Sequence, residues 1–145
     1  MNLSPKGLKL LMLWEGCRLR IYADAGGKPT IGVGHLLRPH ENFSQGITTS
    51  QALDLLDIDI IAFEKDVTSH ILKPLTQDQF DALVIFCYNI GQHGFDSSTV
   101  VKDLLKGDFD DVPRAMRMWN KVGGKICKGL VNRREKEILL WKGEI

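Results

Sequence analysis

The chain has 145 residues, 43% of them hydrophobic, which is enough for a buried core and predicts one globular domain or two small lobes. Its 19 basic and 18 acidic residues leave a net charge of +1, so no general electrostatic field would gather nucleic acid or an anionic membrane. Basic residues do concentrate between positions 114 and 136. This segment is either a solvated helix pair with acidic partners or one wall of a site for a polar, partly anionic polymer.

Cysteine use and the N-terminal sequence bear on the cellular compartment. Cys17, Cys87 and Cys127 are odd in number, widely spaced and without a CxxC or Cys/His pattern, so they predict neither a zinc site nor a disulfide framework. The N-terminal apolar run is interrupted by Glu15, is too short to span a membrane and lacks a cleavage site of small residues. We expect a protein of a reducing compartment, without an export signal or membrane anchor.

The N-terminal quarter predicts one helix followed by a small sheet. Ser4 and Pro5 suit the N-cap and the first helical position, and apolar residues then recur at helical spacing up to Glu15. The sequence "RLRIY" at 18–22 alternates like a strand, "DAGGKP" has the composition of a turn, and "TIGVGH" at 30–35 resembles a second strand. We therefore expect a β-hairpin or small sheet beside the first helix.

The rest of the chain predicts helices. Apolar residues at helical spacing from Thr49 indicate a helix of about twenty residues, long enough to join two lobes, and Pro74 follows it. Thr76 and Gln79 match a capping box ahead of "FDALVIFCYNIG", which is apolar nearly all round and predicts a central buried helix. Further helices are expected in "SSTVVKDLLKG", "FDDVPRAMRMWNKV" and "VNRREKEILLWKG".

Together these elements predict an α+β protein that is mostly α-helical. We expect a single domain over residues 1–145, with a small β-containing lobe at about 13–60. A larger helical lobe would cover about 61–145 and also include the N-terminal helix 4–12. The long helix would join the two lobes.

Two carboxylates near the N-terminus suit the hydrolysis of a glycosidic bond. This reaction needs one neutral carboxylic acid to protonate the leaving oxygen and one ionised carboxylate to activate water or attack the anomeric carbon. Glu15 ends an apolar helix face, where desolvation would raise its pKa, whereas Asp24 lies in a glycine-rich turn and should stay ionised. The alternative is an ordinary helix-end acid and an aspartate that stabilises its own turn.

With Thr30, the two acids form the pattern E-x8-D-x5-T, and "TIGVGH" continues directly from the threonine. The stretch "EGCRLRIYADAGGKPTIGVGHLL" resembles the signature of the phage-type lysozymes, the endolysins of glycoside hydrolase family 24, which include the lysozyme of the T-even phages. Farther along, "ALVIFCYNIG" is similar to the buried central helix of that family, and "LVNRREKEILLW" is similar to its C-terminal helix. The resemblance covers essentially the whole chain.

The resemblance implies a two-lobed lysozyme-like fold and a muramidase activity. The bond cleaved would be the β-1,4 bond between N-acetylmuramic acid and N-acetylglucosamine in peptidoglycan. Glu15 would be the general acid, Asp24 the carboxylate that positions and activates water, and Thr30 a hydroxyl that helps to hold that water. The resemblance also implies inversion at the anomeric carbon. The alternatives are a lytic transglycosylase acting on the same bond and a catalytically silent wall-binding module.

Other residues are expected to support the site. His35 is either a catalytic base or, as the resemblance favours, a structural histidine with a carboxylate partner. Arg133 matches an arginine near the catalytic acid, and its alternative is a surface arginine. Substrate contacts are expected from Gly34, Leu36, Tyr88 and Asn89, with core packing as the alternative for Tyr88. Gly26 and Gly27 permit positive φ in the turn beside Asp24, with loop flexibility alone as the alternative.

The expected partner is the peptidoglycan polysaccharide alone. The pattern calls for no metal and no cofactor, and we expect no nucleic acid, no membrane anchor and a monomer. A phage enzyme of this kind would accumulate in the host cytoplasm and reach the wall, periplasmic or external, after the inner membrane is permeabilised. The resemblance implies that a holin provides that access.

Overall fold

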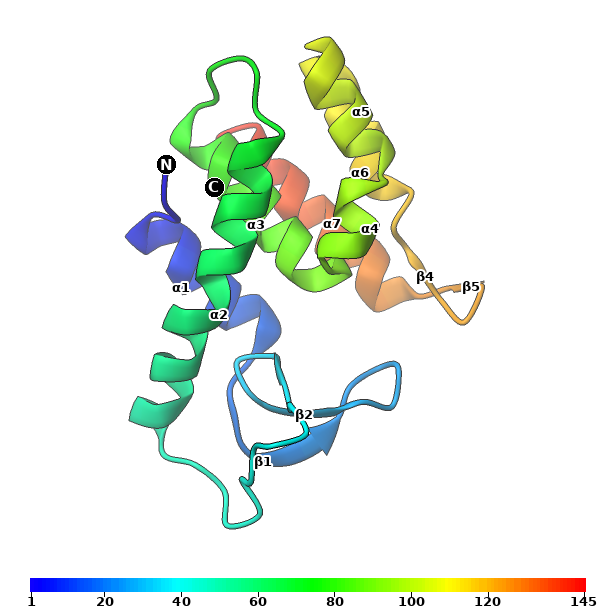
Figure 1. Cartoon of the computed structure of the whole chain (residues 1–145). Coiled ribbons are helices and arrows are strands. Elements are labelled where there is room, and N and C mark those ends of the chain that lie inside the picture. The colour runs from blue at the N-terminus through cyan, green and yellow to red at the C-terminus, as the bar shows by residue number, and fades with distance from the viewer. The chain divides into compact units, whose positions relative to one another are not determined.

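The computed structural model describes residues 1–145 as an α+β protein, mostly helical, in which a small N-terminal sheet precedes most of the helices (Figure 1). The chain divides into two units, a small unit of residues Lys9–Ala62 and a helical unit of residues Met1–Leu8 and Phe63–Ile145. The elements in chain order are α1 (Pro5–Glu15), β1 (Arg18–Ala23), β2 (Pro29–Gly32), β3 (His35–Leu36), α2 (Thr49–Ser69), α3 (Gln77–Ile90), α4 (Gln92–Asp96), α5 (Thr99–Lys106), the 3-10 helix η1 (Phe109–Asp111), α6 (Val112–Arg117), β4 (Lys121–Val122), β5 (Lys125–Ile126) and α7 (Lys128–Trp141).

The small unit is built on an antiparallel sheet with strand order β1-β2-β3. The prediction of a single strand over 30–35 is wrong, because the chain reverses between β2 and β3. Gly32 and Gly34 take φ of 65° and 68° in this turn, a left-handed conformation that favours glycine. The reversal pairs Ile31 with His35, so one predicted strand becomes two short ones.

A small apolar cluster stabilises this unit. Ile31, Ile47 and Ala52 are buried, and Leu37, Phe43 and Leu55 pack against them while remaining partly exposed. The loop before α2 is also tied to the sheet, since Ile47 N–H donates to the carbonyl of Leu19 at 2.9 Å. β1 itself is almost entirely exposed, whereas three of the four residues of β2 are buried.

The long helix expected from Thr49 is confirmed as α2, Thr49–Ser69. A capping box starts it: Gln51 N–H donates to Thr48 Oγ1 at 3.1 Å, and the Gln51 side chain accepts from Thr48 N–H at 2.8 Å. Its first residues belong to the small unit, and those from Phe63 onward belong to the helical unit. No helix of the structure is both long enough and apolar enough to cross a membrane.

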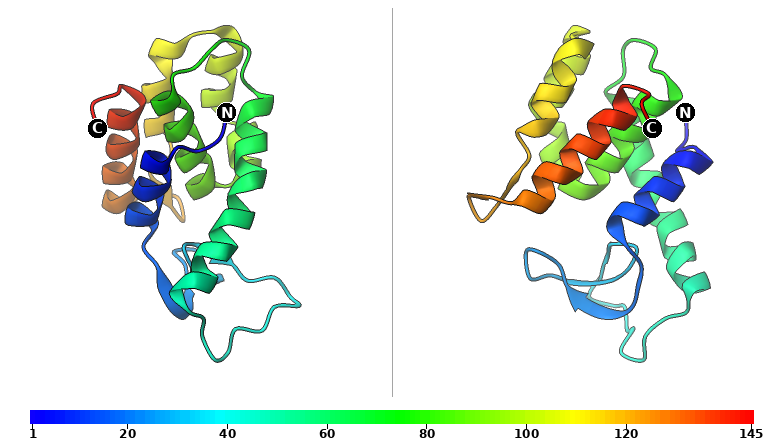
Figure 2. Two further views of the ribbon diagram at one scale, coloured as in Figure 1. Left: turned by 90° about the vertical axis from the view of Figure 1, so that its left-hand side faces the viewer. Right: turned by 180° about the vertical axis from the view of Figure 1, so that it is seen from behind.

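The helical unit is organised around α3. Its predicted capping box is present: Gln79 N–H donates to Thr76 Oγ1 at 3.1 Å, and Thr76 N–H donates to the Gln79 side chain at 2.9 Å. Every residue from Phe80 to Cys87 is buried. α7 packs along α3, and the views in Figure 2 show these two helices side by side. The expectation of a central buried helix is therefore confirmed.

Both ends of the chain belong to the helical unit (Figure 2). Ser4 N–H donates to Asp81 Oδ1 at 3.0 Å, and the Ser4 hydroxyl donates to the other oxygen of the same buried carboxylate. Lys6 Nζ donates to the carbonyl of Ile145 at 2.8 Å. Polar bonds therefore hold the N-terminal segment on elements that come much later in the sequence.

The segment "FDDVPRAMRMWNKV" does not form the single helix expected for it. It forms η1 and then α6, which ends at Arg117, and the chain continues into a hairpin of β4 and β5. Gly123 and Gly124 take φ of 57° and 79°, and two successive positive-φ residues are what a tight hairpin turn requires. The sequence "VGGK" thus contained a hairpin signal that the helical pattern concealed.

Candidate active site

Glu15 is the last residue of α1 and is partly buried. The helix ends here because Gly16 takes φ of 75° while its N–H donates to the carbonyl of Met12 at 2.9 Å. A left-handed glycine in this position is a common helix terminator. The chain turns away immediately after the carboxylate, so Glu15 occupies a fixed point between helix and sheet.

Asp24 follows β1 and organises the turn into β2. Its Oδ1 accepts hydrogen bonds from Gly26 N–H at 2.9 Å and Lys28 N–H at 2.8 Å. Gly27 takes a positive φ of 81°, whereas Gly26 does not use the freedom that glycine permits. Asp24 therefore does stabilise its own turn, as the alternative held. The same bonds fix the carboxylate group in space.

Thr30 lies on the other side of this turn and is 2% exposed. Its hydroxyl donates to the carbonyl of Lys28 at 2.9 Å, while the N–H of Lys28 bonds to Asp24. Asp24 and Thr30 are thus both hydrogen-bonded to the backbone of Lys28. The antiparallel register also places Thr30 opposite Tyr22.

Tyr22 links the predicted carboxylates, although the sequence analysis did not single it out. The pKa of Tyr22 is raised, chiefly by burial and next by the negative charge of Glu15. Arg18 opposes this rise, and Asp24 adds to it. The Arg18 guanidinium lies 4.6 Å from the centre of the Tyr22 ring. Both carboxylates therefore contribute to the raised pKa of Tyr22. Tyr22 lies two residues before Asp24 at the end of β1, and residues two apart in a strand share one face. This spacing could have indicated Tyr22 from the sequence.

His35 has the expected carboxylate partner, and in fact it has two. Nδ1 lies 2.6 Å from Asp59 Oδ2, and Nε2 lies 2.9 Å from Glu41 Oε1. Burial lowers the pKa of His35, but the hydrogen bonds to Asp59 and then Glu41 outweigh burial, so the pKa is raised. With both ring nitrogens occupied, the geometry favours the structural role over that of a catalytic base.

The helical unit holds the remaining predicted site residues on α3 and α7. Arg133 is 9% exposed, so the alternative of a surface arginine is wrong. Its Nε donates to Glu137 Oε2 at 2.9 Å, and Arg134 Nε lies 2.8 Å from Glu137 Oε1. The Arg134 guanidinium stacks over Phe86 at 5.1 Å from the ring centre. A buried cluster of two arginines and one glutamate therefore joins α7 to α3.

The predicted substrate contacts are divided between the two units. Tyr88 is partly buried with its ring 4.9 Å from that of Phe63, which supports the packing alternative for this residue. Asn89 accepts a hydrogen bond from Arg134 through its side-chain oxygen. In the small unit, Gly34 lies in the β2–β3 turn, and Leu36 is 49% exposed.

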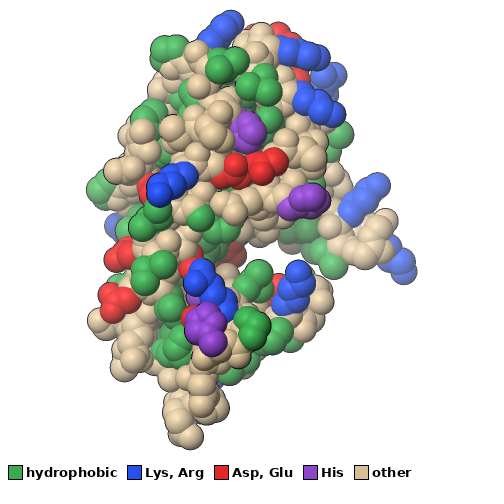
Figure 3. Space-filling model, in the orientation of Figure 1, with side chains coloured by type: hydrophobic (Ala, Val, Ile, Leu, Met, Phe, Trp, Pro, Cys, Tyr) green, Lys and Arg blue, Asp and Glu red, His purple; other side chains and the backbone are tan.

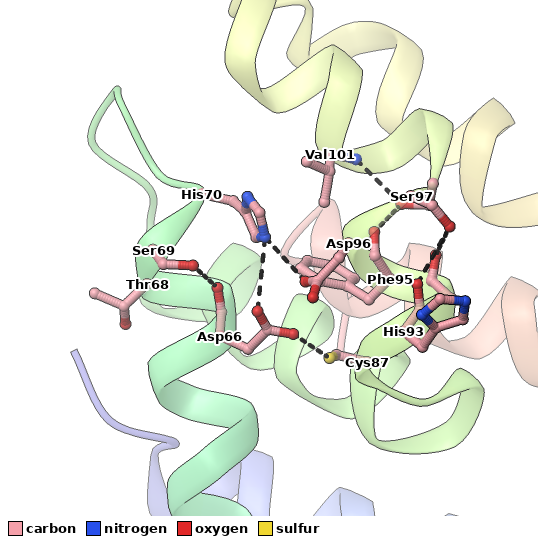
Figure 4. Close-up of polar contacts among 12 residues, drawn as sticks. Asp66, Thr68, Ser69, His70, Cys87, His93, Phe95, Asp96, Ser97 and Val101 are labelled. Carbon is pink, nitrogen blue, oxygen red and sulfur yellow. Dashed lines mark hydrogen bonds and ion pairs between the residues drawn. The ribbon is translucent and has the colours of Figure 1, made fainter.

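A second group of titratable side chains, also missed by the sequence analysis, lies in the helical unit (Figure 4). His70 Nε2 is 3.0 Å from Asp96 Oδ1 and 3.6 Å from Asp66 Oδ1, and Cys87 Sγ lies 3.9 Å from Asp66 Oδ2. Burial, followed by the hydrogen bond with Asp96, raises the pKa of Asp66 to about 6. Burial also raises the pKa of Cys87, so this thiol stays protonated and unreactive.

Comparisons with known proteins identify the family. The sequence model of the phage lysozyme family matches residues 12–137. An endolysin of Bacillus phage PZA is 38% identical over 146 residues, which cover 97% of the chain and 55% of the relative. An endolysin of Acyrthosiphon pisum secondary endosymbiont phage 1 is 36% identical over 146 residues, covering 98% of the chain and 99% of the relative. The solved muramidase domain of SpmX from Asticaccaulis excentricus has a TM-score of 0.84 at 32% identity, with 97% of each chain covered.

Coverage differs among these relatives. The chain spans about half the length of the Bacillus phage endolysins but nearly all of the endosymbiont phage protein. The family match includes Glu15, Asp24 and Thr30, and it extends through Arg133 on α7. The fold seen here, a three-stranded sheet followed by helices, is also that of the solved relative. The chain belongs to the phage lysozyme family.

Proposed function

We propose that this chain is a muramidase that hydrolyses the β-1,4 bond between N-acetylmuramic acid and N-acetylglucosamine in bacterial peptidoglycan, and so lyses the host cell. Its family and its endolysin relatives support this function. The observation that carries the proposal is the arrangement around the β1–β2 turn. There, Asp24 and Thr30 are both hydrogen-bonded to the backbone of Lys28. Glu15 and Asp24 both raise the pKa of Tyr22.

The hydrogen bonds of the turn suggest how a water molecule would be oriented. Thr30 has one hydroxyl hydrogen, and it is donated to the carbonyl of Lys28, so Thr30 Oγ1 can only accept from water. Asp24, when ionised, is also only an acceptor. A water between them would direct its two hydrogens to these oxygens, and a lone pair of its oxygen would be free to attack the anomeric carbon.

Bond cleavage then assigns each side chain one step. Glu15 donates its proton to the glycosidic oxygen, which leaves with the electrons of the broken bond. The oriented water forms the new bond to the anomeric carbon and gives a proton to Asp24. Attack from the side opposite the leaving group inverts the configuration, and an inverting pair needs room for that water, about 6.5–9.5 Å between carboxyl groups. Proton exchange with solvent restores both acids.

Residues outside this group would bind the saccharide and position the acid. We assign substrate contacts to Gly34 and Leu36 in the small unit and to Tyr88 and Asn89 in the helical unit. Arg133, which Glu137 holds in place, is assigned as a supporting residue. The enzyme would act as one catalytic domain, with a small lobe near 13–60 and a helical lobe near 61–145 plus 4–12, as a monomer. It would reach the wall from the host cytoplasm through a holin.

Product analysis of digested peptidoglycan tests the proposal. We expect hydrolysed reducing ends whose anomeric configuration, measured by NMR early in the reaction, is inverted. Products with 1,6-anhydro ends would instead identify a lytic transglycosylase. Sedimentation of the protein with peptidoglycan without release of reducing sugar would identify a silent wall-binding module. Either result would overturn the assignment of Asp24 and Thr30 to water.

A further inference from the structure

Three aspartates converge in the helical unit where α5 ends and α6 begins. One carboxylate oxygen from each of Asp103, Asp108 and Asp111 lies within 4.8 Å of those from the other two. All three residues come from the short stretch "DLLKGDFDD". None of them belongs to the proposed active site.

Backbone hydrogen bonds hold the three residues together without help from the side chains. Gly107 ends α5 in the left-handed conformation, with φ 77° and ψ 17°. Asp108 N–H then donates to the carbonyl of Asp103 at 2.9 Å, and Gly107 N–H donates to the carbonyl of Leu104 at 3.1 Å, which completes a Schellman motif. Asp111 N–H donates to the carbonyl of Asp108 at 3.1 Å. The backbone thus presents three carboxylates to one small region.

Asp103 is the member that needs a partner. It is 8% exposed, and its Oδ2 is enclosed by protein yet accepts no hydrogen bond. Burying a carboxylate oxygen without a partner is unfavourable. Burial, followed by the charges of Asp111 and Asp108, raises the pKa of Asp103, so the neighbouring acids increase this cost.

Helix capping and ion pairing do not account for the cluster. Asp108 and Asp111 occupy the N-cap positions of η1 and α6, where an aspartate side chain usually accepts a backbone N–H. Neither side chain makes such a bond. Arg114 Nη2 lies 3.6 Å from Asp111 Oδ1, but the arginine side chain is 80% exposed, and such a pair contributes little. The enclosed oxygen of Asp103 gains nothing from either arrangement.

We propose that Asp103, Asp108 and Asp111 bind a divalent cation of the calcium class, which holds the end of α5 to the start of α6. Ca²⁺ takes oxygen ligands at about 2.3–2.6 Å, so two oxygens on one ion are at most about 5 Å apart. All three pairs of oxygens meet this limit. Carboxylate donors without imidazole or thiolate favour Ca²⁺ or Mg²⁺ over zinc or copper. The negative end of α5 adds to the attraction.

Calcium chloride added to the full chain at constant ionic strength tests the proposal. We expect saturable binding by calorimetry with a Kd of roughly 0.1–1 mM, as in weak oxygen-donor sites. At about 10 mM Ca²⁺ the thermal unfolding midpoint should rise by roughly 3–6 °C, because the ion binds only the folded chain. A sodium chloride series of matched ionic strength should give no such rise. Wild-type protein without a saturable calcium response would overturn the proposal.

Variants of the cluster and of one neighbour locate the site. D103N and D108N should each abolish the calcium-dependent rise in the unfolding midpoint. D110N is the matched control, because Asp110 is an exposed aspartate of the same η1 helix and is not in the cluster. It should keep the wild-type response. Asp108 is exposed, so D108N decides the matter even where D103N folds poorly. An unchanged response in D108N, or an equal loss in D110N, would show that the cation does not bind here.

Discussion

The two units of this protein are stabilised in different ways. In the helical unit, α3 buries an unbroken run from Phe80 to Cys87, and α7 packs along it. In the small unit fewer apolar residues are buried, and the cluster of Ile31, Ile47 and Ala52 has partly exposed neighbours. Hydrogen bonds from side chains to the backbone and left-handed glycines define its shape instead. The proposed catalytic carboxylates lie in the unit with the smaller core, and for Asp24 hydrogen bonds from backbone N–H groups hold the side chain.

The largest expected effect is the loss of catalytic activity when Glu15, in the small unit, is replaced. Glu15→Gln removes the proton donor while keeping the shape of the side chain, so peptidoglycan hydrolysis should fall by about 10²–10⁴-fold. The thermal unfolding midpoint should stay near that of the wild type, because Glu15 lies outside the buried apolar cluster. Turbidity loss of a purified peptidoglycan suspension measures the rate. Wild-type lysis by this variant would remove Glu15 from the role of general acid.

The next effect compares the two cores directly. Phe80→Ala should lower the free energy of unfolding by about 3–5 kcal/mol, because it leaves a cavity in the centre of the helical unit. Ile31→Ala should cost less, at about 2–3 kcal/mol, because a small cluster can collapse around the gap. Leu105→Ala, at a position 47% exposed, is the control and should change stability by about 0.5 kcal/mol or less. Urea denaturation gives all three values, and a larger loss for Ile31→Ala would reverse the comparison.

A smaller effect concerns the polar bonds of the small unit. His35→Gln should cost about 1–3 kcal/mol, because Asp59 and Glu41 lose a charged partner. The pKa of His35 is raised, so its contribution is complete below pH 6.5 and is lost as pH rises through the higher folded-state pKa. The difference between wild type and variant should therefore shrink above neutral pH. A difference in unfolding free energy that stays constant between pH 6 and pH 9 would contradict this expectation.

The smallest effect is expected from the Asp66 cluster of the helical unit (Figure 4). The pKa of Asp66 is raised to about 6, so the folded state favours the protonated carboxyl and loses stability as pH rises from about 4 through 6. Asp66→Asn removes this loss and should stabilise the protein near pH 7 by about 1 kcal/mol or less, because Asp96 is half exposed to screening solvent. Thermal unfolding at pH 4.5 and pH 7 tests the sign. Asp54→Asn, an exposed position on the same helix, is the control.

Local signals in the sequence were sufficient for most of the fold. The α3 helix was predictable because its capping box and its apolar residues agree, and α1 ends at Glu15 because a glycine follows. The sheet was only partly predictable. The β-branched residues of "TIGVGH" favour a strand, so one strand was predicted there. The positive φ of its two glycines instead reverses the chain. The β4–β5 hairpin was missed for a related reason, since helical spacing on either side outweighed the Gly-Gly turn.

In the candidate site, too, some residues could be predicted from the sequence and others could not. Glu15, Asp24 and Thr30 lie close in the sequence, so their pattern was visible without a structure. The partners of His35 were not visible, because Asp59 approaches from a distant helix and Glu41 from a loop. Tyr22 was also missed, since its role depends on strand register and on charges around its ring. Contacts between distant segments are what a local pattern does not contain.

On the face shown in Figure 3, acidic, basic and histidine side chains are interspersed, in keeping with the small net charge. No continuous basic surface is visible there. A neutral saccharide backbone with scattered carboxylates would meet little long-range repulsion or attraction on such a face. Recognition would then depend on contacts made at short range.

The bonds of Ser4 and Lys6 to Asp81 and Ile145 have a consequence for biosynthesis. Residues 1–8 are synthesised before the small unit, yet they belong to a unit whose remaining residues, 63–145, are synthesised after it. The helical unit therefore depends on segments made at different times, whereas residues 9–62 are contiguous and can fold earlier.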